Sequence, residues 1–441
     1  MERITVIGAG LAGCEATWQI ARRGGKVTLY EMKPGTYSPA HRSPFFAELV
    51  CSNSFKSESI ENASGVLKEE MRQLNSLILK VAEETKVPAG DSLAVDRKIF
   101  SKQITHVLED LENVEVIREE VTFIPEDGIT VVATGPLTSE LLSQEIQKLT
   151  GTRHLFFYDA ISPIVTVDSI NFEKAFKLSR YGKGEDYINC PMNKEEYVQF
   201  VEALNHAEKV PVQQFEKRYL FEGCLPIEEM AGRGRETLAF GPLKPVGLID
   251  PKTQGLPFAV VQLRQEDRFG TLYNLVGFQT RLRHEEQRRV FRMIPGLEKA
   301  EFVRLGSIHR NTFIDSPRLL SESLQLRTRP GLFFAGQITG VEGYMESTAM
   351  GLLSGINAHR CASGMPTIAP PPMTAMGALL HHITRSFAIP FQPMNINFGL
   401  FPPLSGRHRG RERRLHLARQ ALREMEKWKR GNEGQQAERE S

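Results

Sequence analysis

Two glycine-rich turns, close to opposite ends of the chain, constrain its fold more than any other feature of the sequence. Each turn follows a short apolar stretch, residues 3–7 and 331–335, and each precedes a helical pattern rich in small residues. Glycine lets the backbone approach a ligand closely, and the start of a helix offers free N–H groups to an anion. Together the turns predict one nucleotide-binding domain, divided in sequence by the residues between them.

The first turn has the pattern Gly8-x-Gly10-x-x-Gly13 between a predicted strand and a helix predicted over residues 11–23. A second predicted strand ends at Glu31. An acidic residue about 20 positions after the first glycine commonly accepts hydrogen bonds from a ribose. In this βαβ context the pattern indicates a bound dinucleotide, and it fits NAD and FAD equally well.

The composition is that of an ordinary globular enzyme. Of 441 residues, 41% are hydrophobic and 24% are charged, and the length allows several domains. No apolar run is long enough to cross a membrane, and the chain enters its first strand by Ile4 without an apolar leader. We therefore expect a cytoplasmic enzyme with no membrane contact.

The cysteines are five in number and widely spaced, and no two of them form a CxxC pair. This spacing indicates neither a zinc site nor a thioredoxin-like pair, so no metal site is predicted. Each cysteine is expected to be a thiol. Cys14 lies in the first turn of the helix after Gly10, so packing or proximity to phosphate explains it. Cys190 and Cys361 have no supporting context for chemistry, and we expect them to be structural.

Positive charge is concentrated in two segments, although the net charge of the chain is only +2. Residues 407–430 contain ten Lys or Arg against three Glu. The second cluster consists of Arg281, Arg283, Arg288, Arg289 and Arg292. A single basic run is usually a solvated helix face. Two of them beside candidate cofactor segments favour a polyanionic partner.

The region between the turns has a different character. Residues 154–310 alternate short predicted strands, one of them over 239–242, with irregular segments and one clear helix over 194–206. The predicted fold class is therefore α/β, with a split Rossmann-type domain and an inserted α+β domain. The split domain comprises residues 1–153 and 311–441, including a basic C-terminal helix, and the insert comprises residues 154–310.

Smaller expectations concern the first part of the chain. One helix is predicted over residues 65–86 and irregular structure over residues 34–62. Lys33 is expected in a solvated loop, and Asp96 and Arg97 are expected to form a structural ion pair.

Four segments together resemble a known family. They are the opening βαβ unit, Val50-Cys51-Ser52-Asn53-Ser54, Gly223-Cys224-Leu225-Pro226, and the FAGQITGVEGYMES segment at 334–347. The chain resembles the bacterial folate- and FAD-dependent tRNA (uracil-5-)-methyltransferases from Met1 to about Arg430. The glycine turns are shared with a sister family that modifies wobble uridines of tRNA, and the cysteine-bearing segments favour the methyltransferase.

The resemblance implies a substrate and cofactors. The T-loop uridine of tRNA, position 54 in the T-arm, would be methylated at C5 with methylenetetrahydrofolate as the carbon donor. FADH2 would supply the reducing equivalents and would be regenerated by NADPH or NADH. The implied FAD contacts are Gly8, Ala9, Gly10, Leu11, Ala12 and Gly13 at the pyrophosphate, Glu31 at the adenosine ribose, and Gly336, Gly340, Glu342, Gly343 and Glu346 near the ribityl chain and isoalloxazine.

This chemistry requires a cysteine. Uracil C5 is a poor nucleophile until a thiolate adds to C6, and a thiol with a pKa of about 8.5 is mostly protonated at neutral pH. Cys224 is the candidate nucleophile, because Gly223 and Pro226 can form a turn that exposes its sulfur. Two observations oppose this role: glutamates lie nearby in sequence, and a lone cysteine is more often a small buried hydrophobe.

Cys51 is the second candidate. The resemblance implies a place near the flavin and an acid/base or nucleophile-protecting role. A bystander thiol in a Ser-Asn-Ser turn is an equally good interpretation of the residues alone. Tyr344 could stack on a base or on folate, although an aromatic residue there is more often part of the core.

Three other functions fit part of the sequence. They are FAD-dependent modification of another tRNA uridine, a generic FAD/NAD(P)H oxidoreductase, and a non-catalytic tRNA-binding flavoprotein. The absence of a CxxC pair opposes a disulfide reductase, and members of the wobble-uridine family are longer than this chain.

Overall fold

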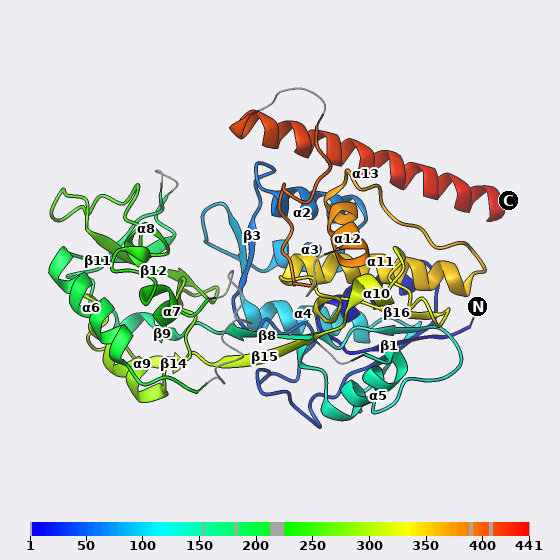
Figure 1. Ribbon diagram of the computed structural model, residues 1–441, viewed down its shortest axis with the longest axis horizontal. Helices are drawn as coiled ribbons and strands as arrows, with labels where there is room; N and C mark the ends of the chain where they lie inside the picture. The colour runs from blue at the N-terminus through cyan, green and yellow to red at the C-terminus, as the bar shows by residue number, and fades with distance from the viewer. Residues whose placement is uncertain are drawn as a thin grey trace.

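A computed structural model describes residues 2–152, 155–180, 184–211, 225–387, 391–404 and 409–440. Figure 1 shows two lobes of unequal size, with both termini in the larger one. Long strands run between the lobes, and the C-terminal helix lies along the outer edge of the larger lobe.

The larger lobe is built on a five-stranded parallel sheet in the order β16-β7-β1-β2-β6. Its strands are β1 (Ile4–Ile7), β2 (Val27–Tyr30), β6 (Val114–Ile117), β7 (Thr130–Val132) and β16 (Leu332–Phe334). β16 pairs in parallel with β7, with Leu332 opposite Thr130. Residues from both ends of the chain therefore share one sheet, which confirms the predicted split Rossmann-type fold.

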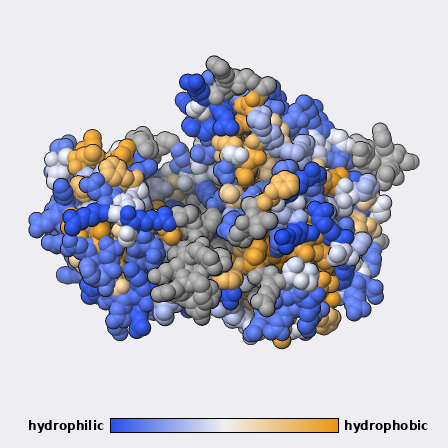
Figure 2. Space-filling view, in the orientation of Figure 1, coloured by the Kyte–Doolittle hydropathy of each residue, from blue (hydrophilic) through white to orange (hydrophobic). Residues whose placement is uncertain are grey.

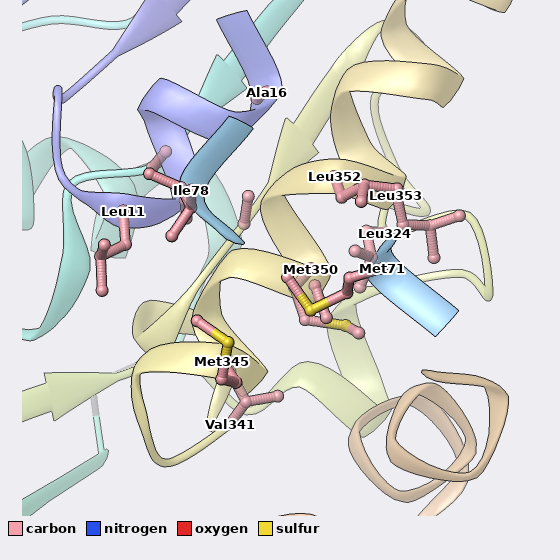
Figure 3. Close-up of a cluster of buried hydrophobic side chains, with 14 of the residues drawn as sticks. Leu11, Ala16, Met71, Ile78, Leu324, Val341, Met345, Met350, Leu352 and Leu353 are labelled. Carbon is pink, nitrogen blue, oxygen red and sulfur yellow. The ribbon is translucent and has the colours of Figure 1, made fainter. Parts of the chain in front are cut away.

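The two helices that follow the glycine turns, α1 (Leu11–Ala21) and α11 (Tyr344–Ala362), pack directly on each other. A Cβ at Gly351 would lie 2.2 Å from the carbonyl oxygen of Ala12, and one at Gly355 would lie 2.6 Å from that of Ala16. Only glycine allows so close an approach. Figure 3 shows Met345 of α11 in the apolar cluster around this contact.

Further helices complete the larger lobe. They are α2 (Ala63–Gln73), α3 (Leu77–Glu84), α4 (Arg97–Glu109), α5 (Glu140–Thr150), α10 (Ser316–Leu319), α12 (Ala375–Arg385) and α13 (Gly410–Glu440). The last of them, α13, packs on α2. Short 3-10 turns are η1 (Gly135–Leu137), η2 (Val167–Ser169) and η6 (Gln337–Thr339). A small antiparallel sheet contains β3 (Ser54–Ser57), β5 (Ser92–Val95) and β4 (Lys86–Val87). Throughout the described ranges, each helix is too short or too polar to cross a lipid bilayer.

Two local predictions for this lobe are wrong. The single helix expected over 65–86 is interrupted at Asn75, whose φ is 57°, and Ser76 then caps α3 by accepting the N–H of Leu79. The irregular segment expected over 34–62 contains β3, because its backbone pairs with β5 far along the chain.

The smaller lobe has its own sheet and its own apolar core. Its six strands are antiparallel in the order β10-β11-β12-β13-β9-β14. They are β9 (Ile164–Thr166), β10 (Phe176–Lys177), β11 (Tyr187–Met192), β12 (Ala259–Gln265), β13 (Leu272–Leu275) and β14 (Phe302–Arg304). Its helices are α6 (Lys194–His206), α7 (Ile227–Ala231), α8 (Thr237–Phe240) and α9 (His284–Phe291).

The expected α+β character of this lobe is confirmed, and α6 has the predicted bounds. Asn193 and Glu196 form a reciprocal capping box at its start. The strand predicted over 239–242 is wrong, because residues 237–240 form the helical turn α8, which ends before Gly241. The boundary near residues 154 and 310 stays a prediction.

A two-stranded ribbon connects the lobes. β8 (Leu155–Ala160) pairs antiparallel with β15 (Ile308–Phe313), and Figure 1 shows both strands running from one lobe to the other. The ribbon contacts η1 and η6, the turns that follow β7 and β16 of the sheet in the larger lobe.

A polar contact also joins the lobes at the start of α4. Arg97 donates to both carboxylate oxygens of Glu266, at 2.6 and 2.8 Å, and Asp96 accepts the N–H of Arg268 at 3.0 Å. The predicted pairing of Asp96 with Arg97 is therefore wrong, because each side chain binds the segment that follows β12.

Candidate functional site

The three glycines of the first turn have different surroundings. A Cβ at Gly8, whose φ is +97°, would lie 2.8 Å from the carbonyl oxygen of Ala133, and one at Gly13 would lie 1.8 Å from that of Gly8. Around Gly10, at the N-terminus of α1, there is no heavy atom within 4 Å of such a Cβ in the described structure. Gly8 and Gly13 are therefore required for packing, and Gly10 leaves room for an anionic ligand at a helix start.

Glu31 lies beside this turn at the end of β2. One carboxylate oxygen accepts the N–H of Ala9 at 2.9 Å, and the other accepts the N–H of Lys33 at 3.0 Å. These bonds fix the carboxylate at the wall of a pocket that Gly8 and Gly10 also line. Its remaining lone pairs can accept ribose hydroxyls, so the pocket fits the adenosine and pyrophosphate of a dinucleotide.

The expectation that Lys33 lies in a solvated loop is wrong. Lys33 is 3% exposed, and its ammonium donates to the carbonyl oxygen of Phe45 at 2.6 Å. The loop after it folds back on the first turn, where the N–H of Ala47 donates to the carbonyl oxygen of Ala9 at 2.9 Å. Lys33 thereby becomes part of the nucleotide pocket.

The second glycine turn is held by close packing. Gly336 and Gly340 have φ angles of 82° and 85°, and a Cβ on them would lie 2.7 Å from Ala12 and 2.4 Å from the ring of Phe391. Neither glycine lines the nucleotide pocket or a second pocket of the described structure. The residues of this turn that do are Gln337, Glu342, Gly343 and Tyr344.

A second pocket, of about 250 Å³, lies where the lobes meet. The loop after residue 49, the ribbon, β12 and the second glycine turn all contribute to it. Its polar lining includes Cys51, Ser52, Lys56, Asp159, Arg264, His309, Asn311, Glu342 and Asn395. Sequence reasoning missed Asp159, Arg264 and His309, because each is an isolated polar residue that belongs to no recognisable motif.

Cys51 lies half-buried at the wall of this second pocket. Its sulfur is 3.0 Å from the hydroxyl oxygen of Tyr344. Burial, together with the charge of Asp159, raises the pKa of the Cys51 thiol to about 12. In this environment Cys51 keeps its proton at neutral pH.

The smaller lobe holds the loop that carries Cys51. Arg264 of β12 donates to Ser52 Oγ at 2.7 Å and to Asn53 Oδ1 at 3.0 Å. The amide of Asn53 donates in return to the carbonyl oxygen of Gln265 at 2.8 Å. The position of Cys51 therefore depends on contact between the two lobes.

Glu346 lies behind Gly343, in the first turn of α11. It is fully buried; one oxygen accepts from Lys56 Nζ at 3.0 Å, and the other has no hydrogen-bond partner in the described structure. Burial and the charge of Asp159 raise the pKa of the neighbouring Glu342 carboxyl. Lys56 and the N-terminus of α11 place positive charge beside these carboxylates.

Cys224 lies outside the described residues. Three positions later, the N–H of Ile227 donates to the carbonyl oxygen of Gln279 at 2.7 Å, and Gln279 lines the second pocket. Cys14 and Cys190 are fully buried, as expected of structural cysteines.

The two basic clusters differ. In the cluster near α9, Arg281 is buried against Glu229 and Arg289 pairs with Glu286. The exposed arginines of α13 for which the described structure contains no carboxylate partner are Arg413, Arg414, Arg419 and Arg423. Figure 2 shows hydrophilic side chains at the beginning of α13, at the top of the molecule. Within the described residues, α13 therefore has more exposed arginines without a carboxylate partner than the cluster near α9.

Comparison with known proteins agrees with this geometry. The family model described as "Glucose inhibited division protein A" matches residues 3–366. A crystal structure of Aquifex aeolicus GidA has a TM-score of 0.69 at 19% identity, over 96% of this chain and 76% of that one. A second crystal form of the same protein has a TM-score of 0.67 at 18% identity, over 87% of this chain and 67% of that one. At this identity the likeness shows the fold alone.

Two relatives named "Methylenetetrahydrofolate--tRNA-(uracil-5-)-methyltransferase TrmFO" are much more similar. The protein of Geobacter sulfurreducens is 59% identical over 427 residues, 96% of this chain and 98% of its own length. That of Geotalea uraniireducens is 60% identical over 429 residues, 97% and 98% of the two chains. The resemblance found in the sequence is confirmed: the chain belongs to the family of methylenetetrahydrofolate–tRNA-(uracil-5-)-methyltransferases.

Proposed function

We propose that this protein methylates C5 of the T-loop uridine of tRNA, position 54, with methylenetetrahydrofolate as carbon donor and FAD with NADPH or NADH as the reducing system. The observation that carries the proposal is the second pocket, in a chain of this family, with Cys51 and the second glycine turn on one wall. We place the reaction in the cytoplasm, where tRNA, folate and reduced nicotinamide cofactors are available together.

The residues present fit FAD. Gly10 and the N–H groups at the start of α1 would hold the pyrophosphate, and Glu31 would hold the adenosine ribose. The remaining positions of the turn would shape this cradle: Gly8, Ala9, Leu11, Ala12 and Gly13. When bound, reduced FAD supplies the reducing equivalents that convert the transferred one-carbon unit to a methyl group.

The second glycine turn would receive the flavin end. Gly343 and Glu342 would lie against the ring, and Lys56 would favour negative charge there. Gly336 and Gly340 would act by holding the turn against α1 and Phe391, and Glu346 by holding Lys56.

The two cysteines would have separate roles. Cys224 would add to uracil C6 as a thiolate, which makes C5 nucleophilic, and would leave when the S–C6 bond breaks. Cys51 would hold a proton at the second pocket, because its pKa of about 12 opposes ionisation at neutral pH.

The T-arm of tRNA would lie against α13. Its exposed arginines can neutralise phosphates, and such binding weakens steeply with salt. Replacing Arg419 and Arg423 with glutamate should weaken tRNA binding about tenfold or more and lower its salt dependence. Lys427 and Arg430 already pair with Glu424 and Glu426, so the matching double change there should have a smaller effect. If both double variants weaken tRNA binding equally, the result would count against the exposed arginines of α13 as the tRNA-binding surface.

A reconstituted reaction tests the function. The FAD-loaded protein is incubated with unmodified tRNA, labelled methylenetetrahydrofolate and NADPH or NADH, and the nucleosides are analysed. We expect labelled ribothymidine, and none from a transcript with cytidine at position 54. FAD-loaded protein that yields no ribothymidine with either nicotinamide would contradict the proposal, and label at a wobble position would assign the other tRNA uridine.

A further inference from the structure

The hydroxyl of Tyr344 contacts three groups of the loop that carries Cys51. Its oxygen lies 2.9 Å from the backbone nitrogen of Cys51, 3.1 Å from that of Ser52, and 3.0 Å from the sulfur of Cys51. The hydroxyl therefore contacts both the backbone and the cysteine side chain of this loop.

The chemistry of these groups fixes the direction of each hydrogen bond. A phenol oxygen has one hydrogen to donate and two lone pairs with which to accept. The two backbone N–H groups can only donate, so they occupy both lone pairs. The hydroxyl hydrogen is left for the sulfur of Cys51, which therefore accepts a hydrogen bond from Tyr344 and does not give one to it.

The position of the hydroxyl is determined by rigid parts of the fold. Tyr344 is the first residue of α11, and its ring packs edge-on against Phe55, with ring centres 5.8 Å apart. On the other side of the contact, Arg97 donates to the carbonyl oxygen of Leu49 at 2.9 Å, just before the Cys51 loop. Such fixed surroundings hold a reactive group in one orientation.

We propose that Tyr344 is a positioning residue for the methylation reaction, whose hydroxyl donates to Cys51 Sγ and thereby leaves the S–H proton of Cys51 directed into the second pocket. The reaction is the one given under the proposed function, and the contact itself does not depend on it. When Cys51 gives up its proton, the same hydroxyl remains as a donor to the thiolate and stabilises it.

Charged groups from four other elements also face Cys51. Asp159 on β8 and Glu342 in the second turn disfavour the thiolate, and Arg97 on α4 and Arg264 on β12 favour it. Burial raises the pKa of Cys51, and the Tyr344 hydroxyl opposes that effect. Loss of the hydroxyl should therefore make Cys51 still harder to ionise.

Alkylation of Cys51 in the holoenzyme tests the proposal directly. Trypsin would release residues 43–56, a peptide whose single cysteine is Cys51, so mass spectrometry can follow its reaction with iodoacetamide at different pH values. In Tyr344→Phe we expect alkylation at a given pH to slow roughly tenfold, since a hydrogen bond to a charged group is lost. The kcat of methylation should fall with little change in the KM for tRNA.

Two further variants separate positioning from a general structural effect. Tyr197→Phe removes a hydroxyl that donates to the carbonyl oxygen of Arg235 at 2.8 Å, in the core of the smaller lobe, and should leave Cys51 alkylation unchanged. Site-specific 3-fluorotyrosine at 344 keeps the ring and all three contacts with a more acidic hydroxyl. It should shift the alkylation profile toward lower pH even if Tyr344→Phe fails to fold.

The outcomes are distinct. An alkylation profile that is the same in the wild type and in the fluorotyrosine protein, with FAD bound, would overturn the proposal. A shifted profile, with a wild-type protein that makes no ribothymidine, would sustain the hydrogen bond from Tyr344 to Cys51 and reject the proposed function.

Discussion

The nucleotide pocket and the second pocket are built in different ways. Every residue that lines the first lies between Ile7 and Leu142, within the first strands and turns of the larger lobe. The second takes its lining from Ala40 to Asn395, from both lobes and the ribbon between them. The nucleotide pocket is therefore formed by one part of the chain, whereas the second pocket forms only when segments far apart in sequence come together.

This difference assigns different tasks to the two regions. A nucleotide-binding turn needs a fixed backbone, which a short sequence pattern can specify. A thiol in the role proposed for Cys51 needs a controlled environment, and the groups that shape it are Tyr344 of α11, Asp159 of the ribbon and Arg97 of α4. Chemistry at the junction can thus respond to contact between the lobes, whereas binding at the turn does not have to.

Removal of the Cys51 thiol should give the largest effect. In Cys51→Ala we expect methylation to fall between about a hundredfold and ten-thousandfold, the range for loss of a proton-transferring group. Most of the FAD content should be retained, because the proposed adenosine and pyrophosphate contacts lie in the nucleotide pocket, which Cys51 does not line. Nucleoside analysis measures the methylation rate, and the flavin absorbance measures the FAD content.

Cys361→Ala is the matched control. Cys361 lies near the C-terminal end of α11, and the N-terminal end of that helix is at the second pocket. The Cys361→Ala variant should methylate tRNA at the wild-type rate. Activity retained in Cys51→Ala would show that the second pocket does not depend on this thiol.

Separation of the lobes is the next largest effect. Glu266→Ala leaves Arg97 without its carboxylate, and the two side chains are only 4% and 16% exposed. Breaking a buried pair costs about 3–5 kcal/mol of unfolding free energy. We expect urea unfolding to show this loss and methylation to fail, and FAD binding to weaken less than tenfold.

An exposed ion pair provides the comparison. Glu286→Ala breaks its pair with Arg289, which is 53% exposed, and should change the unfolding free energy by less than about 1 kcal/mol. If both variants lose the same small amount, the Arg97–Glu266 contact does not hold the lobes together.

Two glycines of one turn should respond differently to the same change. Gly13→Ala places a methyl group 1.8 Å from the carbonyl oxygen of Gly8, and this overpacking should destabilise the FAD-free protein by about 1–3 kcal/mol. Gly10→Ala meets no described atom within 4 Å, so the free protein should keep its melting temperature.

The Gly10 variant should instead bind FAD roughly tenfold more weakly, because its methyl group takes space that the ligand needs. Calorimetry of the FAD-free proteins and titration with FAD separate the two effects. Equal melting temperatures for both variants would be evidence against the packing role of Gly13.

The same difference in construction explains what the sequence predicted. The βαβ pattern, α6 and the split parallel sheet follow from local periodicity and turn chemistry, and all were predicted. Asp159, Arg264 and His309 meet only because the ribbon and β12 reach the larger lobe. Their positions depend on contacts between residues far apart in sequence, which a local pattern does not contain.

Lys33 and Tyr344 illustrate the same limit for residues that the sequence did single out. The sequence around Lys33 is typical of a solvated loop, but the segment that follows buries it. Tyr344 is of a residue type common in cores, and only the structure shows that its hydroxyl binds the Cys51 loop. In both cases the residue type was evident, and the partner was not.

The smallest expected effect concerns His41, which lies at the wall of the nucleotide pocket. Burial and the charge of Lys33 lower the pKa of His41 to about 4, and His309 of the ribbon and Arg304 of the smaller lobe add to this. Since an unfolded histidine has a pKa of about 6.5, the folded state binds the proton less well. The stability due to His41 is therefore complete above about pH 6.5 and is lost as the pH falls toward 4.

His41→Gln should remove about 1–2 kcal/mol of this pH dependence, measured as the unfolding free energy of the holoenzyme between pH 7 and pH 4. His206→Gln, at the exposed end of α6, should behave like the wild type. Arg304→Gln should remove a smaller part, because Arg304 is the weakest of the three charges named. No effect of Arg304→Gln on the pH profile would mean that the nucleotide pocket is electrostatically independent of the smaller lobe. A measurable effect would show that a charge of the smaller lobe influences protonation in the nucleotide pocket.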